Sequence, residues 1–386
     1  MAAPDAALPP IATALVDWQR QHGRHGLPWH GSRDPYRVWL SEIMLQQTQV
    51  TTVLGYYDRF LQRFPSVAAL AAAPLDDVLG LWAGLGYYSR ARNLHACAQA
   101  VVARHGGRFP ASAALLASLP GIGPSTAAAI AAFCFDERTS ILDGNVQRVL
   151  GRVLAFDHDL AQTAPRRTLW ALANQLVPQA SADMPAYTQG LMDLGSTVCT
   201  PRDPSCLTCP LAPVCRARRA GTPLAYPVKT RKLKRGARAS WCLWVAVGDA
   251  LWLQQRPATG IWGGLWTWPM FDDAAALHAV SAELETVLAA AGVAPQATTL
   301  PSEVHVLTHL DWTLHPHRLL VSPAGARSAR LSVRDGDGDA ADVAPALLDH
   351  VDACLQARLG PGRWHRQIDL PTLGLPAPLR RWLLSR

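Results

Sequence analysis

Lysine, long apolar runs and a basic leader are rare or missing in this sequence. Its 386 residues include only three lysines, Lys229, Lys232 and Lys234, so residues 1–228 carry no side-chain amine. No uninterrupted apolar stretch approaches the roughly 18 residues of a membrane-spanning helix, which argues against a membrane protein. The N-terminus has no basic patch before a hydrophobic stretch, so we expect no secretory signal.

Cysteine is also scarce, and its distribution is uneven. The chain has eight cysteines, and four of them crowd into one segment with the pattern Cys199-x6-Cys206-x2-Cys209-x5-Cys215. Such crowding is typical of a metal site in a reducing compartment rather than of a disulfide framework. Four soft ligands suit either an iron–sulfur cluster or a tetrahedral zinc ion, and the spacing alone does not decide between them.

Positive charge gathers in the first part of the chain. The net charge is +7 for the whole chain, but residues 1–240 carry +10 and residues 241–386 carry −3. No acidic residue lies between Asp203 and Asp249, whereas nine basic residues lie in the segment 216–238. That segment is either a solvated linker or a basic strap on a nucleic-acid backbone.

The sequence pattern predicts two domains joined by this basic segment. Residues 8–215 are predicted to be mostly helical, because apolar residues recur at helical spacing from Tyr36 to Leu61 and short Ala-rich segments closed by Pro or Gly follow. Residues 241–247 and 250–253 predict a hairpin around Gly248-Asp249. Further strands are expected at 304–307 and 317–321, and helices at 274–291 and 376–384. We therefore predict a helical domain at 8–215, a basic linker at 216–238 and an α+β domain at 239–386.

A glycine-containing turn precedes an apolar helix in the middle of the helical domain. Leu119-Pro120-Gly121-Ile122-Gly123 leads into residues 126–135, and a turn of this kind can leave backbone N–H groups free to hold a phosphate. Asp143 follows about 20 residues later, next to Gly144. An acidic side chain near a bound phosphate is electrostatically unfavourable, so its presence here indicates a functional role for Asp143.

The turn, Asp143 and the cysteine spacing together resemble the helix-hairpin-helix DNA glycosylases that carry an iron–sulfur cluster. The segments Trp39–Val50, Gly84–Tyr88 and Ile141–Val146 are similar to those of the adenine DNA glycosylases, the MutY branch of that family. The resemblance runs from about residue 11 to the end and weakens after 240. It implies a mainly α helix-hairpin-helix glycosylase domain with a [4Fe–4S] cluster on the loop 199–215, plus an α+β Nudix-like C-terminal domain.

The resemblance also assigns chemistry to two carboxyl groups. Hydrolysis of an N-glycosidic bond needs one acid to protonate the base and one carboxylate to stabilise the cationic sugar. Glu42 is the only acid between Asp34 and Asp58, in an apolar helix, so burial should raise its pKa and keep a proton available. By resemblance, Glu42 protonates adenine at N7 and later helps to activate water, while Asp143 stabilises the oxocarbenium ion or transiently bonds to C1′.

Asn145 and Ser125 complete the predicted catalytic group. Asn145 makes the loop around Asp143 polar, and Ser125 matches a family position close to that aspartate. Bifunctional relatives carry lysine at that position and use it to form a Schiff base before cutting the strand. Because residues 1–228 contain no lysine, we predict a monofunctional glycosylase.

The resemblance further implies a set of contacts with DNA. The residues expected at the gap left by the flipped base are Gln47, Thr48, Leu85 and Tyr87. Trp29 and Gln189 are expected to form walls of the adenine pocket, and Gly121 and Gly123 to contact the phosphate backbone. In the C-terminal domain the segment 255–266 is Nudix-like, but the glutamate-rich magnesium-binding box is missing, which indicates recognition rather than pyrophosphate cleavage. There, Leu307-Thr308-His309 matches a Phe-Ser-His loop of the family that reads the 8-oxoguanine strand.

The expected partner is therefore double-stranded DNA with adenine opposite 8-oxoguanine or guanine. We expect a monomer in the cytoplasm, associated with the nucleoid if the protein is bacterial. Two alternatives remain: an endonuclease III-like glycosylase for oxidised pyrimidines, and a non-catalytic DNA-binding protein that uses the turn and the cluster as a scaffold. A nucleotide hydrolase is not supported, because the metal-binding box is missing.

Overall fold

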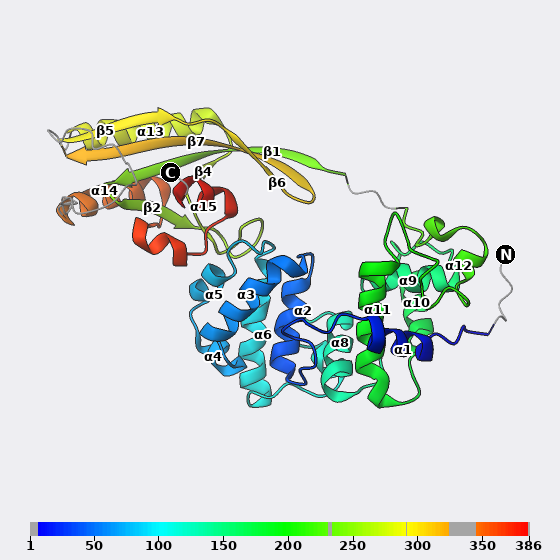
Figure 1. Cartoon of the computed structure of the whole chain (residues 1–386). Coiled ribbons are helices and arrows are strands. Elements are labelled where there is room, and N and C mark those ends of the chain that lie inside the picture. The colour runs from blue at the N-terminus through cyan, green and yellow to red at the C-terminus, as the bar shows by residue number, and fades with distance from the viewer. Residues whose placement is uncertain (1–6, 231–233, 291, 324–344, 385–386) are drawn as a thin grey trace. The chain divides into compact units, whose positions relative to one another are not determined.

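The computed structural model describes residues 7–230, 234–290, 292–323 and 345–384. The chain divides into two units (Figure 1): a helical unit of Met1–Ala73 and Arg92–Lys232, and a sheet unit of Pro74–Ala91 and Leu233–Arg386. The predicted combination of an all-α part and an α+β part is confirmed. By its contacts the segment Pro74–Ala91, which lies within the predicted helical domain 8–215, groups with the sheet unit.

Short helices joined by short loops build the helical unit. Its helices are α1 (Ala12–His22), α2 (Pro35–Leu45), α3 (Val50–Arg63), α4 (Val67–Ala72), α6 (Ser89–His105, which begins in the sheet unit), α7 (Ala113–Leu116), α8 (Pro124–Phe135), α9 (Gly144–Leu154), α10 (Thr163–Gln175), α11 (Met184–Asp193) and α12 (Arg216–Arg219). The Ala-rich α8 lies among α2, α7 and α11, so its alanines are buried on every side. No described helix is long and apolar enough to cross a bilayer.

The helical pattern from Tyr36 to Leu61 is interrupted in the structure. Asp34 caps α2 by accepting a hydrogen bond from the backbone N–H of Tyr36, and the helix ends at Leu45. Gln47 then adopts a left-handed conformation with φ of 56°, and α3 starts at Val50. Glu42 consequently lies in the last turn of a short helix, close to an irregular loop.

Part of the predicted basic linker is folded onto the helical unit. The backbone N–H of Leu160 donates to the carbonyl of Val228 at 3.0 Å, and Arg152 Nε donates to the carbonyl of Pro223 at 2.8 Å. Thr230 Oγ1 donates to Asp159 Oδ2 at 2.5 Å. Within the predicted linker 216–238, these contacts bind residues 216–230 to backbone and side-chain groups of the helical unit.

A mixed sheet forms the second unit. Its strands are β1 (Gly236–Val247), β2 (Ala250–Gln255), β3 (Trp266–Thr267), β4 (Met270–Phe271), β5 (Val293–Thr299), β6 (Glu303–Val306), β7 (Leu310–Pro323) and β8 (Arg363–Arg366). The order along the sheet is β3-β2-β1-β7-β5, with β1 parallel to β7. The predicted hairpin at Gly248-Asp249 is confirmed, since Val247 pairs with Ala250.

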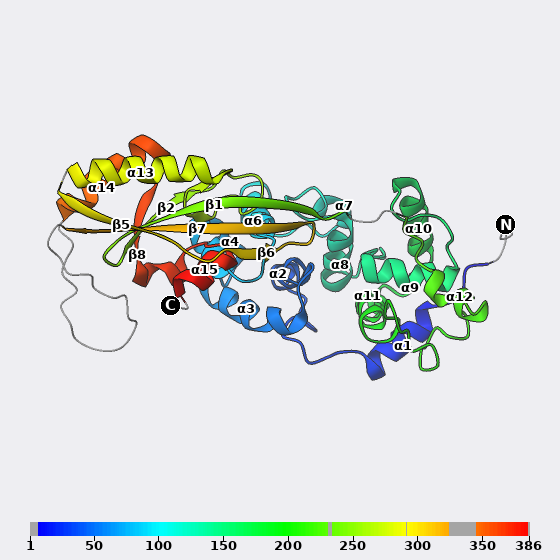
Figure 2. The same cartoon turned by 90° about the horizontal axis from the view of Figure 1, so that it is seen from above.

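Helices pack on this sheet and complete its core. The remaining elements are α5 (Leu75–Leu81), α13 (Ala274–Ala290), α14 (Pro345–Leu359) and α15 (Ala377–Leu384). Helices α13 and α14 run side by side (Figure 2) and bury Leu284 and Leu355 in one cluster with Val245 of β1 and Leu319 of β7. Strands β6 and β7 form a hairpin whose tip is the predicted loop Leu307-Thr308-His309.

Candidate active site

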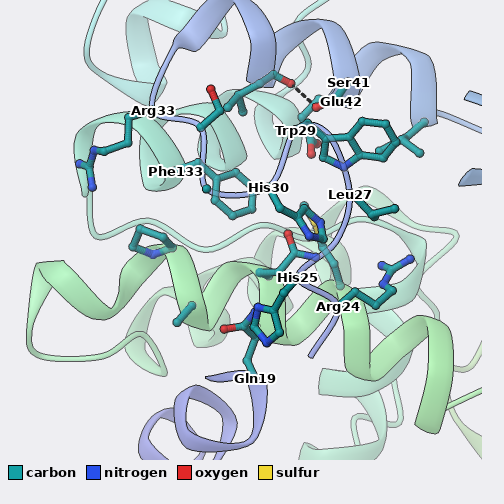
Figure 3. Close-up of a pocket in the computed structure, with 18 of the residues that line it drawn as sticks. Gln19, Arg24, His25, Leu27, Trp29, His30, Arg33, Ser41, Glu42 and Phe133 are labelled. Atoms are coloured by element: carbon teal, nitrogen blue, oxygen red, sulfur yellow. Dashed lines mark hydrogen bonds between the residues drawn. The ribbon is translucent and has the colours of Figure 1, made fainter. Parts of the chain in front are cut away.

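A cavity of about 320 Å³ opens in the helical unit (Figure 3). Glu42 and Trp29 lie toward one end of it and Gln19 toward the other, and Gln189 of α11 also lines it. Trp29 is only 8% exposed and packs edge-on against Tyr57, with ring centroids 5.2 Å apart. Such packing makes one wall of the cavity rigid and aromatic, which suits a planar ligand.

Glu42, which lines the cavity, has a strongly raised pKa. Burial raises its pKa to about 8, with a smaller contribution from the negative charge of Asp143. A carboxyl group with this pKa favours its protonated form at neutral pH, and Glu42 lines the cavity. This agrees with the expectation from its isolation among apolar residues.

Asp143 lies at the N-terminus of α9 and does not line the cavity itself. Its Oδ1 accepts hydrogen bonds from the backbone N–H groups of Asn145 at 2.7 Å and Val146 at 2.8 Å. A helix N-terminus with two such donors favours a negative charge. Because this charge also contributes to the raised pKa of Glu42, the two carboxyl groups are within electrostatic reach of each other.

The glycine turn and Ser125 position the segment that leads to Asp143. Ser125 Oγ accepts a hydrogen bond from the backbone N–H of Leu142 at 3.0 Å, immediately before the aspartate. Gly121 has φ of 72°, and a Cβ there would lie 2.5 Å from the Cβ of Asn93. Gly123 is the residue that caps the start of α8. Gly121 thus has the left-handed conformation that favours glycine, and Ser125 connects the turn to the residue before Asp143.

Two predicted contact residues meet in the sheet unit. Tyr87 is 45% exposed with φ of 49°, and its hydroxyl lies 2.5 Å from Thr308 Oγ1 at the tip of the β6–β7 hairpin. His309 is exposed beside it, and Leu307 is half-buried. Leu85, expected at the DNA gap, is only 5% exposed here. In the helical unit Gln47 is exposed and Thr48 is half-buried, in the loop between α2 and α3.

Comparison with known proteins assigns the family. The profile of HhH-GPD superfamily base excision DNA repair proteins matches residues 40–175, and that of the NUDIX domain matches residues 240–385. The adenine DNA glycosylase of Buchnera aphidicola subsp. Schizaphis graminum is 36% identical over 258 residues, which cover 67% of this chain and 74% of that protein. The chain belongs to the adenine DNA glycosylase family.

Further relatives of this family are similar over different lengths. The adenine DNA glycosylase of Mus musculus is 35% identical over 371 residues, covering 82% of this chain and 71% of the relative. The human protein of the same name is 38% identical over 311 residues, covering 66% of this chain and 56% of the relative. A thermostable thymine-DNA glycosylase of known structure is 26% identical with a TM-score of 0.48, covering 54% of this chain and 94% of that one, and this likeness adds no weight to the assignment.

The four clustered cysteines of this family member share one small cavity near α9. All four are free and line that cavity. The pKa of Cys209 is raised to about 11, mainly by burial and in part by the charges of Cys199, Cys215 and Cys206, so the four sulfurs are within electrostatic reach of one another. Among the residues that the structure describes, no three potential ligands are already arranged as a metal-binding group. The donor set nevertheless fits a thiolate-ligated group, because Arg152 Nη1 donates to Cys199 Sγ at 3.3 Å.

Two buried arginines were missed from the sequence. Arg148 Nη2 donates to Asn145 Oδ1 at 2.9 Å and to the carbonyl of Gly195 at 2.6 Å, while its Nε donates to the carbonyl of Cys199 at 2.8 Å. Arg152, one turn later, is 2% exposed. The available signal was two arginines four residues apart on a helix face that also carries Val149 and Val153. Arg148 therefore connects Asn145, two residues after Asp143, to the cysteine loop.

Proposed function

We propose that this protein is a monofunctional DNA glycosylase of base excision repair that acts as a monomer on double-stranded DNA. It flips out adenine mispaired with 8-oxoguanine or guanine and hydrolyses the N-glycosidic bond of that nucleotide. The observation that carries the proposal is the pairing of a protonated Glu42 with Asp143 at a helix N-terminus. Family membership supports adenine as the base that is removed.

The two carboxyl groups divide the reaction between them. Adenine is a poor leaving group, so the proton of Glu42 is transferred to N7 as the glycosidic bond breaks. Asp143 stabilises the positive charge that develops on the sugar, and its two backbone N–H donors hold the carboxylate in place. The Glu42 carboxylate left after proton transfer then activates the attacking water.

Strand cleavage is not part of this reaction. A Schiff base needs an amine, but residues 1–228 contain no lysine, and the Ser125 hydroxyl is engaged with the backbone of Leu142. Borohydride treatment during turnover should therefore yield no efficient covalent product between protein and DNA. Efficient trapping would overturn the monofunctional assignment.

The four cysteines would hold a [4Fe–4S] cluster with a structural role. Cys199, Cys206, Cys209 and Cys215 are its proposed ligands, and Arg152 would donate an N–H to one of their thiolates. When bound, the cluster would fix the conformation of the loop 199–215 without taking part in hydrolysis. Iron and sulfide analysis of the purified protein tests this point, and a fully active preparation that contains only zinc would contradict it.

Recognition of 8-oxoguanine is proposed for the sheet unit. Tyr87 and Thr308 form a hydrogen bond at the surface, where Tyr87 offers an aromatic ring and Thr308 a hydroxyl group. Removal of residues 240–386 should reduce the preference for adenine opposite 8-oxoguanine and leave some excision opposite guanine. Thr308→Val is the finer test, because it keeps the shape of the side chain and removes the hydroxyl; an unchanged preference in both variants would contradict the role.

Single-turnover assays test the whole proposal. Duplexes with adenine opposite 8-oxoguanine, with adenine opposite guanine and with thymine glycol should be incubated with the full-length protein and analysed with and without hot alkali. We expect abasic product from the two adenine duplexes, revealed as strand breaks only after alkali. Activity confined to thymine glycol would favour the endonuclease III-like alternative, and tight binding without excision would favour the non-catalytic one.

A further inference from the structure

Gln189, which lines the cavity, is tied to a buried acid on the same helix. Its Nε2 donates to Asp193 Oδ1 at 2.8 Å, one turn further along α11. Asp193 is 1% exposed and does not line the cavity. The carboxyl group therefore lies behind Gln189, in direct hydrogen-bond contact with an amide that lines the cavity.

Arg24 fixes the same carboxyl group from the other side. Its backbone N–H donates to Asp193 Oδ2 at 2.9 Å, and its Nε donates to Oδ1 at 2.7 Å. Two hydrogen bonds from one residue, one of them charge-assisted, leave the carboxylate little freedom to rotate. Asp193 thus has a single orientation toward Gln189.

The close approach of Arg24 depends on the residue before it. A Cβ at position 23 would lie 2.5 Å from the carbonyl oxygen of Gln19 and 3.0 Å from Asp193 Oδ2. Gly23 therefore lets the chain after α1 come close enough for the backbone N–H of Arg24 to reach the acid. Arg24 therefore contacts Asp193 through both its backbone N–H and its side chain.

A carboxylate only accepts hydrogen bonds, so it determines which end of the Gln189 amide faces it. The NH₂ group must face Asp193, and the carbonyl oxygen Oε1 lies at the other end of the planar amide. Without Asp193, the amide could present either end to the cavity, since its oxygen and nitrogen are nearly the same size.

We propose that Asp193, held by Arg24, is a positioning residue that keeps the Gln189 oxygen available to the bound base. It thereby selects a purine with an amino group at C6. This inference rests on the proposed function. Adenine offers the N–H of its 6-amino group to such an acceptor. Hypoxanthine presents a carbonyl at the same place, and two acceptors then oppose each other without a hydrogen atom between them.

The test compares single-turnover excision of adenine and of hypoxanthine, each opposite 8-oxoguanine, by the full-length protein. The wild type should remove adenine much faster. Asp193→Asn replaces the acceptor by a group that both donates and accepts, so Gln189 can turn its NH₂ into the cavity. We expect the ratio of hypoxanthine to adenine excision to rise about tenfold or more, because this substitution relaxes a hydrogen-bonding requirement of the site.

Two further variants separate positioning from a general loss of structure. In a Gln189→Leu background, Asp193→Asn should no longer change the ratio, because Asp193 acts through the missing amide. Asp183→Asn is the matched control: Asp183 also pairs with an arginine of α1, Arg20, at 2.6 Å, but neither residue lines this cavity. That variant should leave the ratio unchanged.

The outcomes are distinct. If Asp193→Asn slows both bases equally, or changes the ratio to the same extent without Gln189, the inference is wrong and Asp193 only stabilises the fold. If Asp193→Asn does not fold, Gln189→Leu alone must raise the ratio, because it removes the oxygen that accepts from the 6-amino group, and an unchanged ratio there overturns the inference. If the wild type excises no adenine, the proposed function itself fails.

Discussion

The last turn of α2 and the N-cap position of α9 each carry one carboxyl group, and the chain surrounds these two groups differently. Around Glu42 the chain supplies burial, which raises the pKa to about 8. Around Asp143 it supplies two backbone N–H donors at a helix N-terminus. A helix end with free N–H groups favours a charge, whereas a half-buried position late in an apolar helix opposes one.

This contrast shows how burial in one short chain segment can set the protonation state of Glu42. Each environment also reinforces the other, because the negative charge of Asp143 helps to keep Glu42 protonated. A substitution at either position therefore tests both the local environment and the coupling between the two.

The largest effect is expected when the proton donor is removed. Glu42→Gln keeps the shape of the side chain but supplies no acid, so single-turnover excision of adenine should fall by about 10²–10⁴-fold. Binding of the mismatched duplex, measured by fluorescence anisotropy, should remain. An unaffected rate would show that Glu42 is not the acid and would favour a different catalyst.

Asp143→Asn removes the charge at the other end of the comparison. We expect a loss of about 10²–10³-fold in the same assay, since an electrostatic stabiliser of the cationic sugar is lost while the amide oxygen can still accept from the N–H of Asn145 and Val146. The variant should also titrate Glu42 at lower pH, because one cause of its raised pKa is gone. A rate profile identical to that of the wild type would show that the two groups are not coupled.

The sequence predicts this contrast better than it predicts the surrounding geometry. The isolation of Glu42 among apolar residues and the polar loop at Asp143 are local features, and both are found in the structure. The packing of residues 216–230 on the helical unit and the grouping of Pro74–Ala91 with the sheet unit depend on partners far along the chain.

The buried arginines show the same limit. Arg148 and Arg152 bind carbonyl groups 47 and 48 or more residues away, including those of Gly195 and Thr200. Neither hydropathy nor helical spacing indicates which carbonyls will face a helix. Sequence reasoning found the acids because their chemistry is local, and it missed the arginines because their partners are not.

The pH dependence of the rate offers a smaller and more direct test. Since Glu42 must be protonated and its pKa is about 8, activity should be maintained below pH 8 and should fall about tenfold per pH unit above it. The profile of kcat/KM between pH 6 and about 10 measures this. Glu42→Gln should lack this decline, and a wild-type decline centred far below pH 8 would contradict the assigned environment.

The raised pKa of Glu42 should also make the free energy of unfolding depend on pH, which is the smallest of the expected effects. Glu42 ionises more readily in the unfolded chain than in the native protein, so the unfolded state binds fewer protons between the two pKa values, from about 4.5 up to about 8. The free energy of unfolding of the wild type should therefore decrease with rising pH in this window relative to Glu42→Gln, which has no proton to lose. In thermal unfolding followed by circular dichroism, the difference should amount to roughly a few degrees in Tm across the window. Parallel curves for the two proteins would mean that native Glu42 ionises as it does in the unfolded chain, and the contrast with Asp143 would then have no basis in burial.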